Sequence, residues 1–147
     1  MKGTHTPARI LLVASLAAVA ATSSCDSNPW EDFGGARTTW QQARIASYTF
    51  EYRALGFRPH FHAIITVQDG VPTTADVIDG GGIGSPTSPE YYPTVDGLFE
   101  EVENTLANPN DTTSVSYDPE LGYPTRLWSE SGEEGFGFEV LSLTPAP

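Results

Sequence analysis

The sequence predicts an α+β domain, in which a mostly antiparallel sheet of about six strands carries two helices on one face in the order αβββαβββ. Three observations support this fold class. Residues 48–54 and 61–68 alternate apolar and polar side chains with the two-residue period of half-buried strands. Residues 94–107 repeat apolar side chains every three or four positions, as an amphipathic helix does. Every link but one between consecutive expected strands is short enough for an antiparallel neighbour.

The first half of the domain is expected to be one helix followed by three strands. A short helix over residues 36–46 has Trp40 on its apolar side. The strands at 48–54 and 61–68 come next, and Asp69-Gly70 is a strong signal for a two-residue hairpin. That hairpin turns the chain into a third strand at 71–79, which Pro72 places at an edge of the sheet.

The second half repeats this order after a surface loop over residues 80–93. Thr94 is expected to cap the helix at 94–107, and Asn108-Pro109 ends it. Strands are expected at 113–117, 125–130 and 135–143, each joined to the next by a short polar turn. The four residues 144–147 are expected to fray.

The first 24 residues have the pattern of an export signal. Lys2 and Arg9 precede an apolar run at 10–21, whose 12 residues are too few to cross a bilayer. The segment Thr22-Ser23-Ser24-Cys25 resembles a bacterial lipobox, in which the cysteine is diacylated and becomes the new N-terminus. Cleavage after Ala20 by ordinary signal peptidase is the alternative, and it yields a soluble secreted form. Because Cys25 is the only cysteine and cannot form an internal disulfide, we favour acylation.

Cleavage before Cys25 leaves 123 residues, with five arginines against 19 acidic residues and therefore a formal charge of −14. Such a chain repels phosphate backbones, which excludes nucleic acid as a partner. We expect residues 25–35 to form a tether and residues 36–143 a single domain that stands off the bilayer.

Four segments together identify a family resemblance. They are YTFEY at 48–52, VQDG at 67–70, PTVDGLF at 93–99 and, most specifically, YDPELGYPT at 117–125. In this order and spacing they resemble domain-of-unknown-function family 6174, whose members are bacterial envelope proteins and often lipoproteins. The resemblance covers about residues 36–143 and implies no established activity. Many members carry a C-x-C pair where this chain has residues 56–58, and an acidic D-D-E cluster where it has 133–135, so no thiol chemistry is carried over.

Two histidines are candidate binding or metal-ligating residues. His60 and His62 lie two apart on the outward face of their expected strand, a spacing that can hold two metal ligands side by side. The simpler interpretation, which we favour, is a pair of exposed strand histidines, with Glu51 as a partner across the sheet. No third histidine or free cysteine is available in the domain to complete a nitrogen or sulfur site.

An acidic hairpin and several aromatic residues complete the candidates. Glu130, Glu133 and Glu134 can bind a divalent cation through carboxylate oxygens, although a solvated acidic turn is the simpler interpretation. Tyr91 and Tyr92 can line an aromatic binding surface. Trp128 is more simply expected in the core.

These observations predict a membrane-anchored envelope lipoprotein with a non-enzymatic binding or interaction domain. Its expected partners are the membrane, through the N-terminal lipid, and an envelope protein, and no cofactor is expected. The alternative is a divalent-cation-binding module that uses the acidic hairpin. An envelope hydrolase is the least favoured class, because neither histidine of the domain has a convincing serine partner and no G-x-S-x-G motif occurs.

Overall fold

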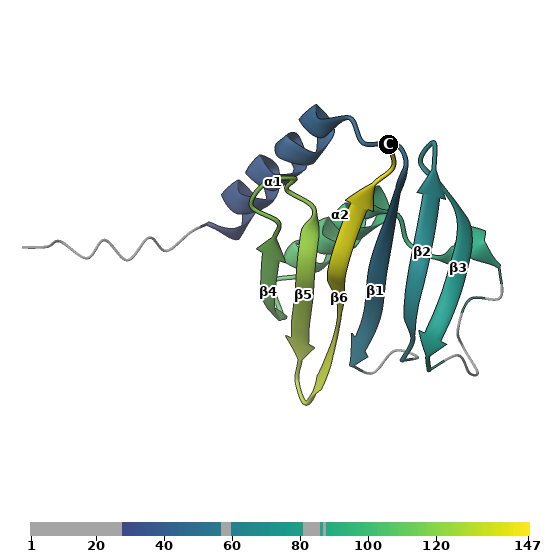
Figure 1. Cartoon of the computed structure of the whole chain (residues 1–147). Coiled ribbons are helices and arrows are strands. Elements are labelled where there is room, and N and C mark those ends of the chain that lie inside the picture. The colour runs from purple at the N-terminus through teal and green to yellow at the C-terminus, as the bar shows by residue number, and fades with distance from the viewer. Residues whose placement is uncertain (1–27, 57–59, 81–85, 87) are drawn as a thin grey trace, which may run out of the picture.

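The computed structural model describes residues 28–56, 60–80, 86 and 88–147 (Figure 1). The predicted signal peptide, Cys25 and the first part of the predicted tether lie outside these residues. None of the described helices has the length and hydrophobicity that crossing a bilayer requires.

The described chain forms one six-stranded antiparallel sheet and two helices, which confirms the predicted fold class. The elements in chain order are α1 (Pro29–Ala43), β1 (Tyr48–Gly56), β2 (His62–Gln68), β3 (Val71–Asp79), a 3-10 turn η1 (Pro89–Tyr91), α2 (Val95–Leu106), β4 (Thr112–Tyr117), β5 (Pro124–Ser131) and β6 (Glu134–Pro145). The strand order across the sheet is β3-β2-β1-β6-β5-β4. The first and last strands therefore pair at its centre, and β3 lies at an edge as Pro72 predicts.

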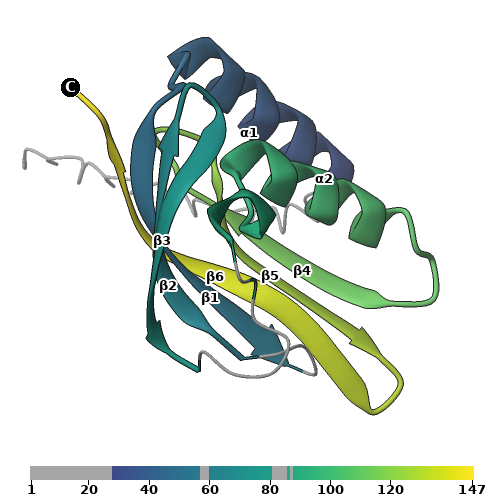
Figure 2. The same ribbon diagram turned by 90° about the vertical axis from the view of Figure 1, so that its right-hand side faces the viewer.

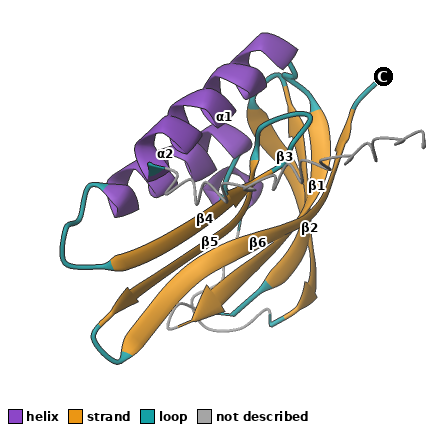
Figure 3. Ribbon diagram, turned by 90° about the vertical axis from the view of Figure 1, so that its left-hand side faces the viewer, coloured by secondary structure: helices purple, strands orange, loops and turns teal. Residues whose placement is uncertain are grey.

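Both helices pack on one face of the curved sheet (Figures 2 and 3). The inward residues of β1 and β2 are buried, as the alternation predicts, and Phe50, Ile65 and Phe138 lie at the centre of the core. The predicted apolar stripe of α2 meets them with Val95, Leu98, Phe99 and Val102, which are almost completely buried. No described helix lies on the opposite face, which we call the open face and which is turned toward the viewer in Figure 1.

Helix α1 begins seven residues earlier than predicted, so the predicted tether is wrong from Pro29 onward. The side chain of Asn28 accepts a hydrogen bond from the Trp30 amide at 3.1 Å, and Pro29 occupies the first helical position, where its missing N–H costs nothing. Gly34 and Gly35, which suggest a linker in the sequence, are exposed on the helix while Phe33 beside them is buried. The helix also ends earlier than predicted, because Arg44 adopts a left-handed conformation with a φ of 52°.

The predicted frayed tail is also wrong. Strand β6 continues to Pro145, which lies opposite Tyr48, and the Ala146 amide donates to the Ser47 carbonyl at 2.9 Å. Among the described strands only β6 lies on that side of β1, so the C-terminal residues bond the backbone groups at the start of β1.

The segment YDPELGYPT forms the β4–β5 connection and seats α1 on the sheet. Asp118 Oδ1 accepts hydrogen bonds from the amides of Glu120 and Leu121, at 3.0 and 2.7 Å. Gly122 has a φ of +79°, and a Cβ there would lie 2.3 Å from the carbonyl oxygen of Ala36 in α1. Tyr123 then packs its ring edge against Trp40 of the same helix. The most specific segment of the sequence therefore has a structural role.

Candidate functional site

A row of charged side chains crosses the open face of the sheet. The strand register places Arg126 of β5 opposite Glu139 of β6, and Glu139 opposite Arg53 of β1. Arg53 in turn lies opposite His62 of β2, and His62 opposite Asp79 of β3. Since directly opposite residues share a face of a sheet, these five residues form one line across five neighbouring strands. We call this line the charged row.

Glu139 contacts both arginines of the charged row. Its two carboxylate oxygens lie 3.4 Å from Nη1 of Arg53 and 3.3 Å from Nη1 of Arg126. The arginine side chains are 43% and 54% exposed, so each of these ion pairs adds little to stability. A guanidinium group has five N–H donors. Each arginine that pairs with Glu139 through Nη1 therefore retains donors that can bind another molecule.

His62 is held by Glu51, as the sequence predicts. Nε2 of His62 lies 2.6 Å from Oε1 of Glu51, which is two residues along β1 from the directly opposite Arg53. At the end of the charged row His62 also lines a pocket of about 190 Å³, together with Arg53, His60 and Asp79. The structure thus brings the two predicted histidines together and adds Arg53 and Asp79, which sequence reasoning missed as site residues.

The histidines do not form a metal centre with other described residues. No group of three His, Cys, Asp or Glu side chains with metal-binding geometry occurs in the described part of the chain. The pocket instead offers the hydrogen-bond donors of Arg53 and the histidine rings beside the carboxylate of Asp79. Donors and an acceptor side by side suit a ligand group that can both accept and donate hydrogen bonds.

The acidic hairpin, Glu130, Glu133 and Glu134, connects β5 to β6 at the end of the sheet. Oε1 of Glu130 accepts a hydrogen bond from Nε1 of Trp128 at 2.9 Å, and Glu133 and Glu134 are exposed. The structure does not gather these three side chains with any other described acid into a group that could hold a cation.

Trp128 lies on the open face, so the expectation of a core position is wrong. Its neighbours Leu127 and Ser129 are the inward residues of β5 and are completely buried. Trp128 itself is opposite Gly137, and a Cβ at Gly135 would lie 2.3 Å from Cζ2 of its ring. Gly135 of β6 therefore provides room for the indole ring on the open face.

The two predicted tyrosines do not share a binding surface. Tyr92 is buried against the ring of Phe61, and its hydroxyl donates to the carbonyl of Pro86 at 3.2 Å. Burial raises the pKa of Tyr92 above its ordinary value. Tyr91 is 71% exposed. Tyr92 is therefore part of the core, and Tyr91 alone remains at the surface.

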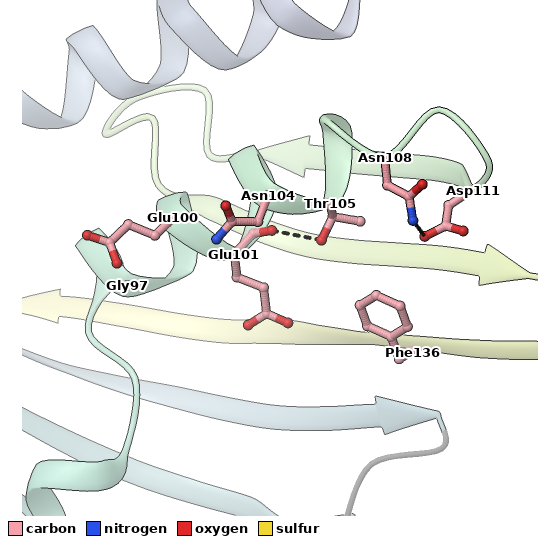
Figure 4. A pocket seen from close by; sticks show the side chains of 8 residues that line it. All are labelled: Gly97, Glu100, Glu101, Asn104, Thr105, Asn108, Asp111 and Phe136. Atoms are coloured by element: carbon pink, nitrogen blue, oxygen red, sulfur yellow. Dashed lines mark hydrogen bonds between the residues drawn. The ribbon is translucent and has the colours of Figure 1, made fainter.

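A polar groove of about 520 Å³ lies between α2, the α2–β4 connection and β6 (Figure 4). It is lined by Gly97, Glu100, Glu101, Asn104, Thr105, Asn108, Asp111 and Phe136. Nδ2 of Asn108 donates to Oδ2 of Asp111 at 2.8 Å, whereas Oδ1 of Asp111 is buried and has no hydrogen-bond partner within the described part of the chain. Sequence reasoning did not find this groove, because its far wall is Phe136 of β6, which meets the residues of α2 and the α2–β4 connection only when the helix packs on the sheet.

The chain matches one known family. The profile of a family described as "Family of unknown function (DUF6174)" matches residues 32–128, about two thirds of the chain. No curated protein and no solved structure matches the chain.

Proposed function

This chain belongs to the DUF6174 family, and we propose that it is a bacterial envelope lipoprotein whose domain binds a protein partner through the open face of its sheet. In this proposal the signal peptide is cleaved before Cys25. Diacylation of Cys25 then anchors the chain, because two acyl chains suffice for stable membrane attachment. The domain lies outside the cytoplasm.

The observation that carries the binding role is the charged row with Trp128 beside it. Tryptophan and arginine are the residue types that dominate the energetics of protein interfaces. Trp128, Arg126 and Arg53 lie close together on the face that no described helix covers. A partner surface with carboxylates aligned to the arginines and a donor aligned to Glu139 fits this pattern of charges.

A structural role alone does not account for the charged row. Exposed ion pairs typically contribute less than about 1 kcal/mol each, so the fold does not depend on this alignment. A partner that covered these pairs would have to bond the remaining arginine donors, because charges removed from water are costly unless their hydrogen-bonding groups are satisfied.

No catalytic hydroxyl group is paired with His62 among the described residues. The contact with Glu51 leaves the second ring nitrogen available, so a nucleophile would have to lie within hydrogen-bond reach of that nitrogen. Nε2 of His62 contacts Glu51, and no described serine or threonine hydroxyl bonds to either histidine.

Two single substitutions test the role of the open face. Arg126→Gln removes one charge and one ion pair with a glutamate from the charged row. Arg37→Gln is the matched control, because Arg37 forms one ion pair with Glu103 at 2.9 Å on the helical side of the molecule. Each acylated variant is used to capture partners by crosslinking in intact membranes, followed by solubilisation and mass spectrometry.

We expect a protein that is captured by the wild type and by Arg37→Gln and lost with Arg126→Gln. Identical capture by all three proteins, or capture of nothing above background, would contradict the proposed binding face. Circular dichroism of each variant checks that the fold is unchanged.

A further inference from the structure

We infer that the first turn of α1 lies against the membrane surface and that Trp30 sits at the lipid–water interface. This inference rests on the proposed acylation of Cys25. It goes beyond the proposed binding role of the open face, because it concerns how the domain is placed on the bilayer.

The early start of α1 limits how far the domain can stand from its anchor. Four residue steps separate Cys25 from Pro29, where the helix begins. A fully extended chain spans at most ~3.6 Å per residue, so the helix begins within about 14 Å of the cysteine Cα. A tether that reached Gly35 would allow roughly 36 Å by the same rule. An acylated cysteine lies at the level of the headgroups, and the first helical turn must therefore lie close to them.

Trp30 is the residue of this turn that suits an interface. It is 44% exposed, although it is a large aromatic residue, and its ring meets that of Phe33 edge-on with centroids 5.9 Å apart. Tryptophan is enriched at membrane interfaces because its ring is mostly apolar while its N–H remains hydrogen-bonded. The exposed carboxylates of Glu31 and Asp32 keep the turn at headgroup level, since charges in the hydrocarbon core are costly.

The charge of the domain indicates which kind of lipid surface it can contact. A mature chain with a formal charge of −14 is repelled by anionic lipid, although salt at 0.15 M screens this repulsion beyond about 8 Å. Zwitterionic headgroups do not repel it. We therefore take a zwitterionic phospholipid surface as the occupant of this site.

This position leaves the open face accessible. Helix α1 begins on the side of the sheet where β4 lies (Figure 1). Strand β3 is at the opposite edge. The charged row then runs from β5 toward the edge that is farther from the anchor.

Quenching by brominated lipid tests the inference on the acylated full chain. The protein is reconstituted in phosphatidylcholine vesicles whose acyl chains carry bromine, which quenches only nearby indoles. Trp128→Phe retains Trp30 as a reporter, and Trp30→Phe retains Trp128. The buried Trp40 stays in both variants as a common background.

We expect the fractional loss of fluorescence to be about twofold or more greater in Trp128→Phe than in Trp30→Phe, because interfacial tryptophans lie near the acyl chains. Equal losses in the two variants, or no loss in either, would overturn the inference. The intact mass of the same sample separates the two proposals. An acylated protein without Trp30 quenching refutes the membrane contact alone, whereas a protein without acyl mass refutes both.

A longer tether tests the role of its length. Twelve inserted glycine and serine residues between Ser27 and Asn28 have an r.m.s. span of about 19 Å. We expect this insertion to reduce the quenching of Trp30 to the level of Trp128. Quenching that persists unchanged would show that the short tether does not hold the helix at the surface.

Discussion

Replacing Tyr48 with phenylalanine removes one hydroxyl group from the junction between β1 and α2. That hydroxyl accepts a hydrogen bond from the amide of Val95 at 2.8 Å. Val95 is the first residue of α2, so its amide has no partner within the helix, and the Thr94 side chain binds Gly97 instead. Tyr48 is only 3% exposed and Val95 is completely buried. Water therefore cannot replace the lost acceptor, and Tyr48→Phe leaves a buried donor unsatisfied.

The expected loss in the free energy of unfolding follows from this one hydrogen bond. An unsatisfied buried donor costs about 1–3 kcal/mol, while the phenylalanine ring retains the packing against Trp40 and Phe50. For a domain with an m-value of ~2 kcal/mol/M, the urea midpoint falls by roughly 0.5–1.5 M. Equilibrium urea unfolding followed by circular dichroism measures this change.

Tyr117→Phe is the matched control. The Tyr117 hydroxyl is also buried but has no hydrogen-bond partner among the described residues, and its ring stacks on Phe99. Removing it should leave stability unchanged or raise it slightly, because an unsatisfied polar group disappears. An unchanged urea midpoint in Tyr48→Phe, or an equal loss in both variants, would refute this account of the junction.

Three further predictions concern alkaline stability, the loop that seats α1, and calcium. Burial, with a nearby aspartate in each case, raises the pKa of Tyr48 and of Tyr117 to about 12, above the unfolded value of 10.0. The folded chain therefore holds these two protons to a higher pH than the unfolded chain does. The free energy of unfolding should be constant below pH 10 and fall as pH rises toward 12, by up to ~1.4 kcal/mol per pH unit for each group. Urea titrations should show this decline, and either phenylalanine variant should weaken it. In urea unfolding, Gly122→Ala should lower the free energy of unfolding more than Gly70→Ala does. Both glycines have a φ of +79°, but only a Cβ at Gly122 would meet a backbone oxygen, that of Ala36. Equal losses in the two variants would contradict the close approach of the loop to α1. Millimolar calcium should leave the melting temperature unchanged, whereas a rise with calcium concentration would restore the acidic hairpin as a cation site.

The elements that could be predicted from the sequence are those whose patterns are local. The alternation of β1 and β2 and the apolar stripe of α2 follow directly from burying one face of each element. The start of α1 was missed because Gly34-Gly35 suggested a linker, although Asn28-Pro29 followed by two acidic residues is itself a helix-start signal. In the structure the burial of Phe33 and Trp40 outweighs the low helix propensity of two glycines.

The candidate site depends on register, which the sequence specifies only in part. Counting back from the Asp69-Gly70 hairpin places His62 opposite Val77. Two register shifts between β2 and β3 move Asp79 into that position instead, so the end of the charged row could not be found from spacing. The face of Trp128 was missed for another reason. A tryptophan suggests a core position, and only the absence of a side chain at Gly135 of β6 shows how the open face accommodates its ring.

The state of Cys25 is the most direct test of the account, because the membrane anchor and the position of α1 both depend on it. The measurement is the intact mass of the mature protein from its native membrane, combined with detergent phase partitioning. We predict a chain that begins at Cys25, carries the added mass of acyl chains and enters the detergent phase. A chain that begins at Ala21, carries no acyl mass and stays in the aqueous phase would contradict it.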